Sequence, residues 1–185
     1  MKSESFPRIR PVVRHEAKKE VREILDRIEE HFGMLPNLFA TIARYPKALK
    51  PIFDLYRALC AESSIDPRLQ ELAILKVSQV NSCPYCISHH TKMAQGLGIS
   101  QEELSSLENY EKWDNFSPKE RAVIEYAEYV TQDAERVPDE LFERLQSSFP
   151  EREIVNLTLI IGLFNLFTRF NGAIQVELED KKGGF

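Results

Sequence analysis

Apolar residues recur at helical spacing along most of the chain, and this periodicity limits the possible fold more than any other feature. In the segment before Gly33, apolar side chains are spaced three and four residues apart, at Val21, Ile24, Leu25, Ile28 and Phe32. No segment alternates apolar and polar residues between turn residues, as a half-buried strand does. The sequence therefore predicts an all-α protein.

Capping residues mark where helices begin. Asp66-Pro67 is an N-cap residue followed by a first-turn proline. Ser100 and Ser117 each have a glutamate three residues later, the spacing of a capping box. We therefore predict a single-domain helical bundle of about eight helices over residues 1–185, in which residues 179–185 form a frayed tail.

Composition excludes several classes of protein. The chain has 185 residues, of which 43% are apolar and 29% charged, and a net charge of −5 with both signs interleaved, which argues against a nucleic-acid surface. The N-terminus has no apolar core of a signal peptide. The longest uncharged run, 154–168, is shorter than the roughly 20 residues of a membrane span. We expect a soluble, cytoplasmic protein with no nucleic-acid or membrane partner.

The helix around 157–170 is apolar on nearly every side. Such a helix is normally buried at the centre of its own domain or against another subunit. The sequence leaves both arrangements open.

Two of the three cysteines, Cys83 and Cys86, stand three residues apart. In a reducing compartment such a pair indicates redox chemistry or a metal site more often than a structural disulfide. Because Pro84 suits a first helical turn, Cys83 is predicted at or just before a helix N-terminus, with Cys86 one turn inside. Unpaired backbone N–H groups and the helix dipole there favour thiolate over thiol, most of all at Cys83.

Helical geometry selects a base for this pair. At about 100° per residue, His90 falls about 20° from Cys83 and between the two sulfurs, whereas His89 falls about 120° away. His90 is therefore the candidate that exchanges protons with the thiols. Glu71, twelve residues before Cys83, is by default a solvated carboxylate, but a helical hairpin would bring it beside His90 and let it orient the ring.

Other interpretations of the same residues stay open. Cys83, Cys86 and His90 could bind zinc, with His89 or Cys60 as a fourth ligand. The two thiols could also be buried and purely structural. A thioredoxin-like fold is disfavoured because the chain lacks the βαβ context. Cys60 lies on the apolar face of its helix and is predicted to serve packing.

Glu71, eleven intervening residues, the Cys-x-x-Cys pair, three further residues and His90 together resemble the signature of the AhpD-like alkylhydroperoxidases of the carboxymuconolactone decarboxylase superfamily. The segment 33–39 is similar to its peroxidase-related branch. The resemblance covers roughly residues 30–175 and is strongest over 66–98.

The resemblance implies an all-α, cofactor-free enzyme that assembles as a homo-oligomer, as a dimer, trimer or hexamer. It implies that Cys86 attacks the peroxide, that Cys83 resolves the sulfenic acid into a disulfide, and that Glu71 and His90 relay protons. One position departs from the pattern, because Tyr85 stands where well-characterised members have histidine, and tyrosine is a poor base at neutral pH.

We therefore predict a thiol-dependent peroxidase that reduces hydroperoxides through a Cys83–Cys86 dithiol/disulfide cycle, with a dithiol or protein reductant whose identity the sequence does not give. One alternative is a disulfide reductase or adaptor for a partner such as a peroxiredoxin. The other is a non-redox protein like the decarboxylases of the superfamily, which generally lack the cysteine pair.

Overall fold

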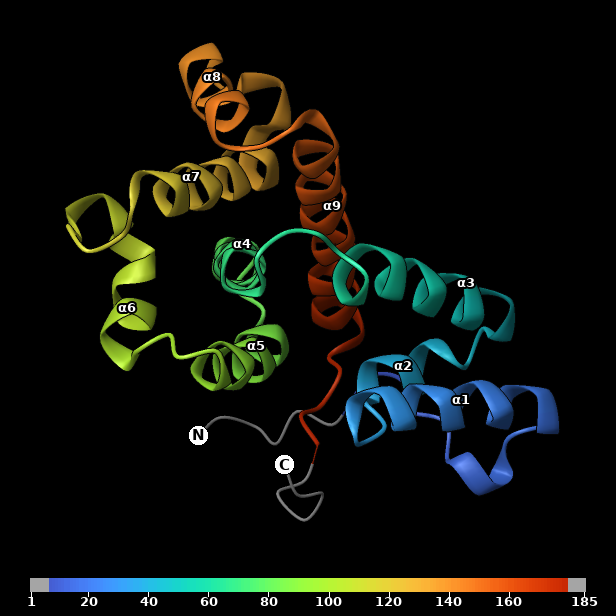
Figure 1. Ribbon diagram of the computed structural model, residues 1–185. Coiled ribbons are helices and arrows are strands. Elements are labelled where there is room, and N and C mark those ends of the chain that lie inside the picture. The colour runs from blue at the N-terminus through green and yellow to red at the C-terminus, as the bar shows by residue number, and fades with distance from the viewer. Residues whose placement is uncertain (1–6, 180–185) are drawn as a thin grey trace. The chain divides into compact units, whose positions relative to one another are not determined.

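The computed structural model describes residues 7–179, and this part of the chain contains nine α-helices and no strand (Figure 1). The all-α prediction is confirmed, with one helix more than expected. The helices are α1 (Lys19–Phe32), α2 (Asn37–Ile42), α3 (Pro46–Tyr56), α4 (Pro67–Val80), α5 (Pro84–Gly96), α6 (Gln101–Ser106), α7 (Pro118–Asp133), α8 (Asp139–Ser148) and α9 (Glu151–Ile174). Short 3-10 segments span Arg14–Glu16, Leu107–Lys112 and Ala134–Arg136, and a π-helical turn spans Arg57–Ala61.

The predicted helix starts are confirmed. The Asp66 carboxylate accepts a hydrogen bond from the Arg68 backbone N–H at 2.8 Å and caps α4. Ser100 and Ser117 form complete capping boxes at the starts of α6 and α7. In each box the serine hydroxyl accepts a hydrogen bond from the backbone N–H of the glutamate three residues later, and the serine backbone N–H donates to the carboxylate of that glutamate. Local sequence therefore determines where these three helices begin.

The chain divides into two compact units. The first contains the described residues up to Ala58 and those from Phe170 onward, including α1, α2 and α3. The second contains residues 59–169, with α4 to α8 and most of α9. All four residues predicted for the functional site lie in the second unit.

The core of the first unit contains a cluster of aromatic side chains. The cluster of rings in mutual contact consists of His31, Phe32, Phe39, Phe53 and Tyr56. Residue Glu179, where the predicted tail begins, accepts a hydrogen bond from the Asn37 backbone N–H at 2.6 Å. Residues 180–185 lie outside the described part of the chain.

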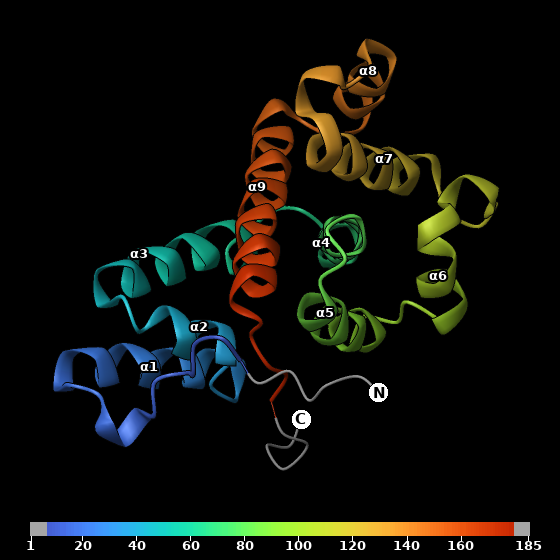
Figure 2. The ribbon, with the colours of Figure 1, turned by 180° about the vertical axis from the view of Figure 1, so that it is seen from behind.

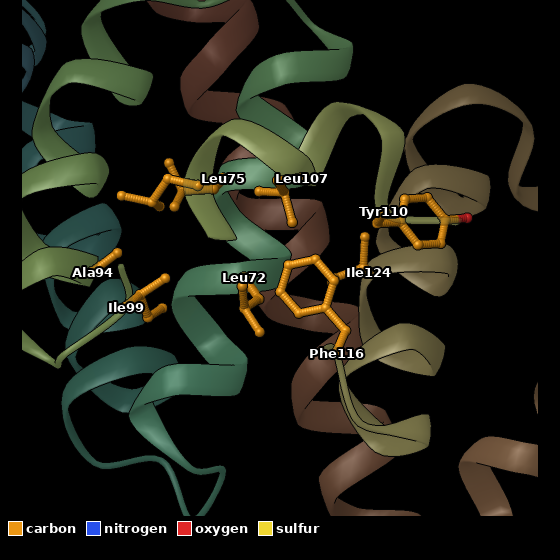
Figure 3. Packing of buried hydrophobic residues seen from close by; sticks show 9 residues of the cluster. Leu72, Leu75, Ala94, Ile99, Leu107, Tyr110, Phe116 and Ile124 are labelled. Carbon is orange, nitrogen blue, oxygen red and sulfur yellow. The ribbon is translucent and has the colours of Figure 1, made fainter. Parts of the chain in front are cut away.

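In the second unit, both ribbon views show α4 surrounded by α5, α6 and α7 (Figures 1 and 2). Residues 69–78 of α4 are all buried. Side chains of this unit form a continuous apolar core, shown in Figure 3, which consists of Leu72, Leu75, Ala94, Ile99, Leu104, Leu107, Tyr110, Phe116 and Ile124. Because α4 is buried on every side, its polar residues Glu71 and Lys76 must find partners inside the protein.

Helix α9 is buried on one face and exposed on the other. Leu157, Ile160 and Ile161 are fully buried, whereas Val155 and Leu159 are 58% and 49% exposed. Its 24 residues are long and apolar enough to cross a membrane by length and composition, a test that core helices of soluble proteins also pass. The sequence argument used only the uncharged run 154–168, which is shorter than a membrane span. The helix itself is longer than that run.

Candidate dithiol site

The two cysteines lie where the chain reverses between α4 and α5. Asn81 ends α4, and Ser82 has a left-handed backbone with φ of 49°. The Cys83 N–H then donates to the Ser78 carbonyl at 2.9 Å, which closes the end of α4. Cys83 is the N-cap residue of α5 and Pro84 occupies the first turn, as predicted.

The two thiols are neighbours. The sulfurs of Cys83 and Cys86 lie 2.9 Å apart, and both residues are buried, at 2% and 4% exposure. The sulfurs can therefore bond to one another with only a small movement of the side chains.

The start of α5 favours negative charge on the first sulfur. The backbone N–H of Cys86 donates to the Cys83 sulfur at 3.4 Å, and the positive end of the helix dipole lies at the same place. A hydrogen bond to the charged form and a helix N-terminus both stabilise a thiolate. These two features place negative charge more favourably on Cys83 than on Cys86, as the argument from sequence proposed.

His90 and Glu71 form a buried pair across two helices. His90 Nδ1 lies 2.8 Å from Glu71 Oε2, and the residues are 9% and 5% exposed. The default expectation of a solvated Glu71 is therefore wrong, because the whole central part of α4 is enclosed. The hairpin alternative for Glu71 is the arrangement observed, and the carboxylate holds the imidazole in one orientation.

The neighbouring histidine has a different environment. His89 packs on the ring of Tyr85, with centroids 4.5 Å apart, one turn away on α5. His90 follows Cys86 by one helical turn, so the two side chains share a face of α5. Of the two histidines, His90 is the one that pairs with Glu71, and its proton exchange with the thiols stays a prediction.

Cys60 is also close to this group but differs chemically. Burial, together with the negative charge of Glu71, raises the pKa of the Cys60 thiol to about 12. Cys60 therefore stays protonated at neutral pH and is a poor nucleophile.

Metal binding was an alternative for the same side chains. Within residues 7–179, no three His, Cys, Asp or Glu side chains are grouped so that they could hold a metal ion.

Sequence reasoning missed the contribution of α9. The Phe164 ring packs edge-on against the His90 ring at 4.9 Å, and Asn165 and Thr168 both accept hydrogen bonds from Asn81 in the turn before Cys83. The available signal was that Asn165 and Thr168 are polar residues inside a largely apolar stretch of α9.

Comparisons with known proteins identify a family for this chain. Residues 46–129 match the model of the carboxymuconolactone decarboxylase family. The uncharacterised protein YdfG of Bacillus subtilis is 34% identical over 130 residues, which are 70% of this chain and 88% of YdfG.

Two solved structures share the fold. One is an uncharacterised peroxidase-related protein of Ralstonia eutropha, described as an alkylhydroperoxidase AhpD core, with a TM-score of 0.83, 21% identity and coverage of 97% of this chain and 95% of that one. The other is the debrominase Bmp8 bound to tribromopyrrole, with a TM-score of 0.79, 20% identity and coverage of 92% and 91%. One fold thus carries proteins described by different chemistries. By these sequence matches, the chain belongs to the carboxymuconolactone decarboxylase family.

Proposed function

We propose that the protein is a thiol-dependent peroxidase that reduces small hydroperoxides through Cys86 and Cys83. The observation that carries this proposal is the 2.9 Å contact between the two sulfurs, with the buried His90–Glu71 pair reached one helical turn beyond Cys86 on α5. A nucleophile, a resolving thiol, a base and a residue that orients the base are the groups such a cycle requires. The proposal needs no cofactor.

In the first half of the cycle, the Cys86 thiolate attacks one peroxide oxygen. The S–O bond forms as the O–O bond breaks, and sulfur gives up two electrons to the peroxide. The departing alkoxide takes a proton and leaves as an alcohol, and Cys86 becomes a sulfenic acid. His90 takes the Cys86 thiol proton on Nε2 as the thiolate forms and returns it to this alkoxide, because its Nδ1 is engaged by Glu71.

In the second half, the Cys83 sulfur attacks the sulfur of the Cys86 sulfenic acid. The S–S bond forms, the S–O bond breaks, and hydroxide leaves with a proton as water. An external dithiol then returns two electrons and regenerates both thiols. The thiolate-favouring position of Cys83 at the N-cap of α5 suits an attacking sulfur in this step.

This assignment also accounts for the electrostatics of the two sulfurs. A proton that passes between sulfurs 2.9 Å apart lets either thiol become the thiolate. His90, one turn beyond Cys86, then favours Cys86 for attack on the peroxide, whereas the helix N-terminus favours Cys83 for the resolving attack.

Peroxide turnover with a dithiol reductant tests the proposal. Cys86→Ser is expected to abolish turnover, and Cys83→Ser to stop the cycle at a sulfenic acid that dimedone traps on Cys86. Cys60→Ser is the matched control and should keep the wild-type rate. Wild-type turnover in Cys86→Ser would contradict the proposal.

A disulfide reductase or adaptor is the second candidate for the same dithiol. Burial of both sulfurs favours a small substrate over a protein disulfide, because exchange between proteins requires access to the attacking thiol. A mixed disulfide trapped between one specific protein and the Cys83→Ser or Cys86→Ser variant would favour the adaptor. Full activity after both thiols are blocked would instead favour a non-redox, decarboxylase-like function.

The proposal places this enzyme in the cytoplasm as a homo-oligomer. A reducing cytoplasm supplies the thiols that complete the cycle. Sedimentation velocity of the purified chain measures the oligomer, for which a dimer, trimer or hexamer is expected and a monomer would contradict this part of the proposal.

A further inference from the structure

The turn that carries Cys83 is tied to α9 by a hydrogen-bonded group of side chains. The Asn81 amide nitrogen donates to Asn165 Oδ1 at 2.8 Å and to Thr168 Oγ1 at 2.9 Å. Asn165 in turn donates to Thr131 Oγ1 on α7 at 3.1 Å. The residue two positions before Cys83 is therefore connected to two other helices.

The remaining hydrogen-bonding groups of Asn165, Thr168 and Thr131 also have partners. Asn165 uses its second amide hydrogen on the Ile161 carbonyl at 3.1 Å, and the Arg169 guanidinium donates to its side-chain oxygen. Thr168 donates to the Phe164 carbonyl at 2.8 Å, and Thr131 to the Ala127 carbonyl at 2.6 Å. A partly buried polar network with its donors and acceptors matched in this way holds one geometry.

The turn itself requires such support. Ser82, which follows Asn81, has a φ of 49°, a conformation that costs a non-glycine residue on the order of 1 kcal/mol. Cys83 must hold its extended N-cap backbone for its sulfur to meet both the Cys86 sulfur and the Cys86 N–H. A loosened turn would lose those two contacts together.

The same stretch of α9 also supports the base. Phe164, whose carbonyl accepts the Thr168 hydroxyl, packs its ring against His90. One turn of α9 thus contacts both the segment that holds Cys83 and the imidazole that serves Cys86.

We propose that Asn81, Asn165 and Thr168 are positioning residues that hold Cys83 in place for closure of the Cys83–Cys86 disulfide. The inference rests on the proposed function, in which that closure is the resolving step. None of the three residues touches the reacting atoms, and each acts through the backbone of the turn.

The test measures closure without a peroxide. The protein, in a Cys60→Ala background, is treated with dithiodipyridine. One cysteine thiolate attacks the reagent, and the first pyridinethione leaves. The second thiolate then attacks the cysteine sulfur of the mixed disulfide, and the second pyridinethione leaves as the protein disulfide forms. The rate of the second release is the closure rate.

Asn81→Ala and Asn165→Leu are expected to slow closure at least tenfold, and Thr168→Ser, which keeps a hydroxyl oxygen for Asn81, to stay within about twofold of wild type. Asn156→Leu is the matched control. Asn156 is also an asparagine of α9, but it binds Ser63 and the Leu59 carbonyl. In this control the Cys83–Cys86 disulfide should close at the wild-type rate.

Two outcomes overturn the inference. One is an unchanged closure rate in a folded Asn81→Ala protein. The other is an equal slowing in Asn156→Leu, which would show a general loss of packing. Amide hydrogen exchange over residues 81–86 gives a second measurement, expected to be faster in Asn81→Ala and unchanged in the control. If wild type fails to reduce peroxides but these differences persist, the proposed function fails and the positioning role survives.

Discussion

His90 Nδ1 and Glu71 Oε2 lie 2.8 Å apart, and this contact joins α5 to the centre of α4 through two buried side chains. A carboxylate enclosed in this way is costly unless a donor satisfies it. The imidazole satisfies the carboxylate, and the carboxylate in turn fixes the tautomer and orientation of the ring. The pair is therefore structural and, in the proposed cycle, also catalytic.

Replacing Glu71 by glutamine tests that second role. Glu71→Gln keeps a hydrogen-bonding side chain but removes the negative charge beside the His90 ring. The second-order rate of peroxide consumption is expected to fall about 10- to 100-fold, which is less than the roughly 100- to 10,000-fold contribution of general acid–base catalysis because His90 itself is kept. Stopped-flow measurement of thiol oxidation gives this rate. Glu125→Gln, at an exposed pair with Arg144, is the control. Equal rates in Glu71→Gln and wild type would remove Glu71 from the mechanism.

From the raised pKa of Cys60 we expect the free energy of unfolding to depend on pH in the alkaline range. Because its pKa is raised from about 9 to about 12 in the folded protein, the unfolded chain loses this proton first as pH rises. Its contribution to stability is complete below about pH 9 and declines toward pH 12. Urea unfolding of Cys60→Ala should show a shallower loss of stability over this range than wild type. Parallel curves for the two proteins would contradict the raised pKa.

The contacts of Arg68 lead us to expect that stability depends on pH in the acid range. The Arg68 guanidinium donates to Glu103 and Glu120, the glutamates of the two capping boxes. Burial alone would raise the pKa of both carboxyls, but hydrogen bonds from Arg68 and from the capping residues Ser100 and Ser117 hold both pKa values below their usual range. These folded-state pKa values are depressed, so the stabilisation is present above the unfolded value of about 4.3 and is lost as pH falls below it.

Arg68→Met is therefore expected to cost about 2–3 kcal/mol in the free energy of unfolding at pH 7. The difference from wild type should shrink as the pH is lowered below about 4. Arg144→Met, which removes an exposed ion pair with Glu125, should cost at most about 1 kcal/mol. Chemical denaturation at pH 7 and pH 3.5 compares the variants, and a cost for Arg68→Met that does not depend on pH would be inconsistent with this network.

Lys76 makes a buried ion pair that a double-mutant cycle can separate from packing. Its amine lies 2.9 Å from Glu128 and 4.8 Å from the centre of the Tyr110 ring, and only 4% of its side chain is exposed. Lys76→Met leaves Glu128 without its cation and is expected to cost about 3 kcal/mol. The double variant Lys76→Met with Glu128→Leu should recover at least half of that loss. Additive losses in thermal unfolding would show that the two charges do not interact.

Features encoded within one helix were predictable from sequence. The capping boxes at Ser100 and Ser117 depend on residues three apart, and the choice of His90 over His89 depends only on helical geometry. The placement of Cys83 at the N-cap of α5 followed from Pro84. Each of these relations is complete within about two turns of chain, so no tertiary information was needed.

Features that depend on a distant partner were not predictable. The sequence showed Asn81 only as the end of a helix, because its partners Asn165 and Thr168 lie on α9. Lys76 fell within the apolar register of α4, and its burial against Glu128 depends on how α7 packs on α4. Glu71 is buried because other helices enclose α4 on all sides. The spacing of apolar residues within α4 does not indicate this enclosure.

In the proposed cycle, Cys83 and Cys86 give two electrons to a hydroperoxide and bond to each other. The most direct measurement is the intact mass of the reduced protein after one equivalent of an organic hydroperoxide, followed by peptide mapping. The account predicts a loss of about 2 Da, located in a peptide that links Cys83 to Cys86, and no such loss in Cys86→Ser. A protein that keeps its reduced mass while the peroxide remains unconsumed, or that gains oxygen only at Cys60, would contradict it.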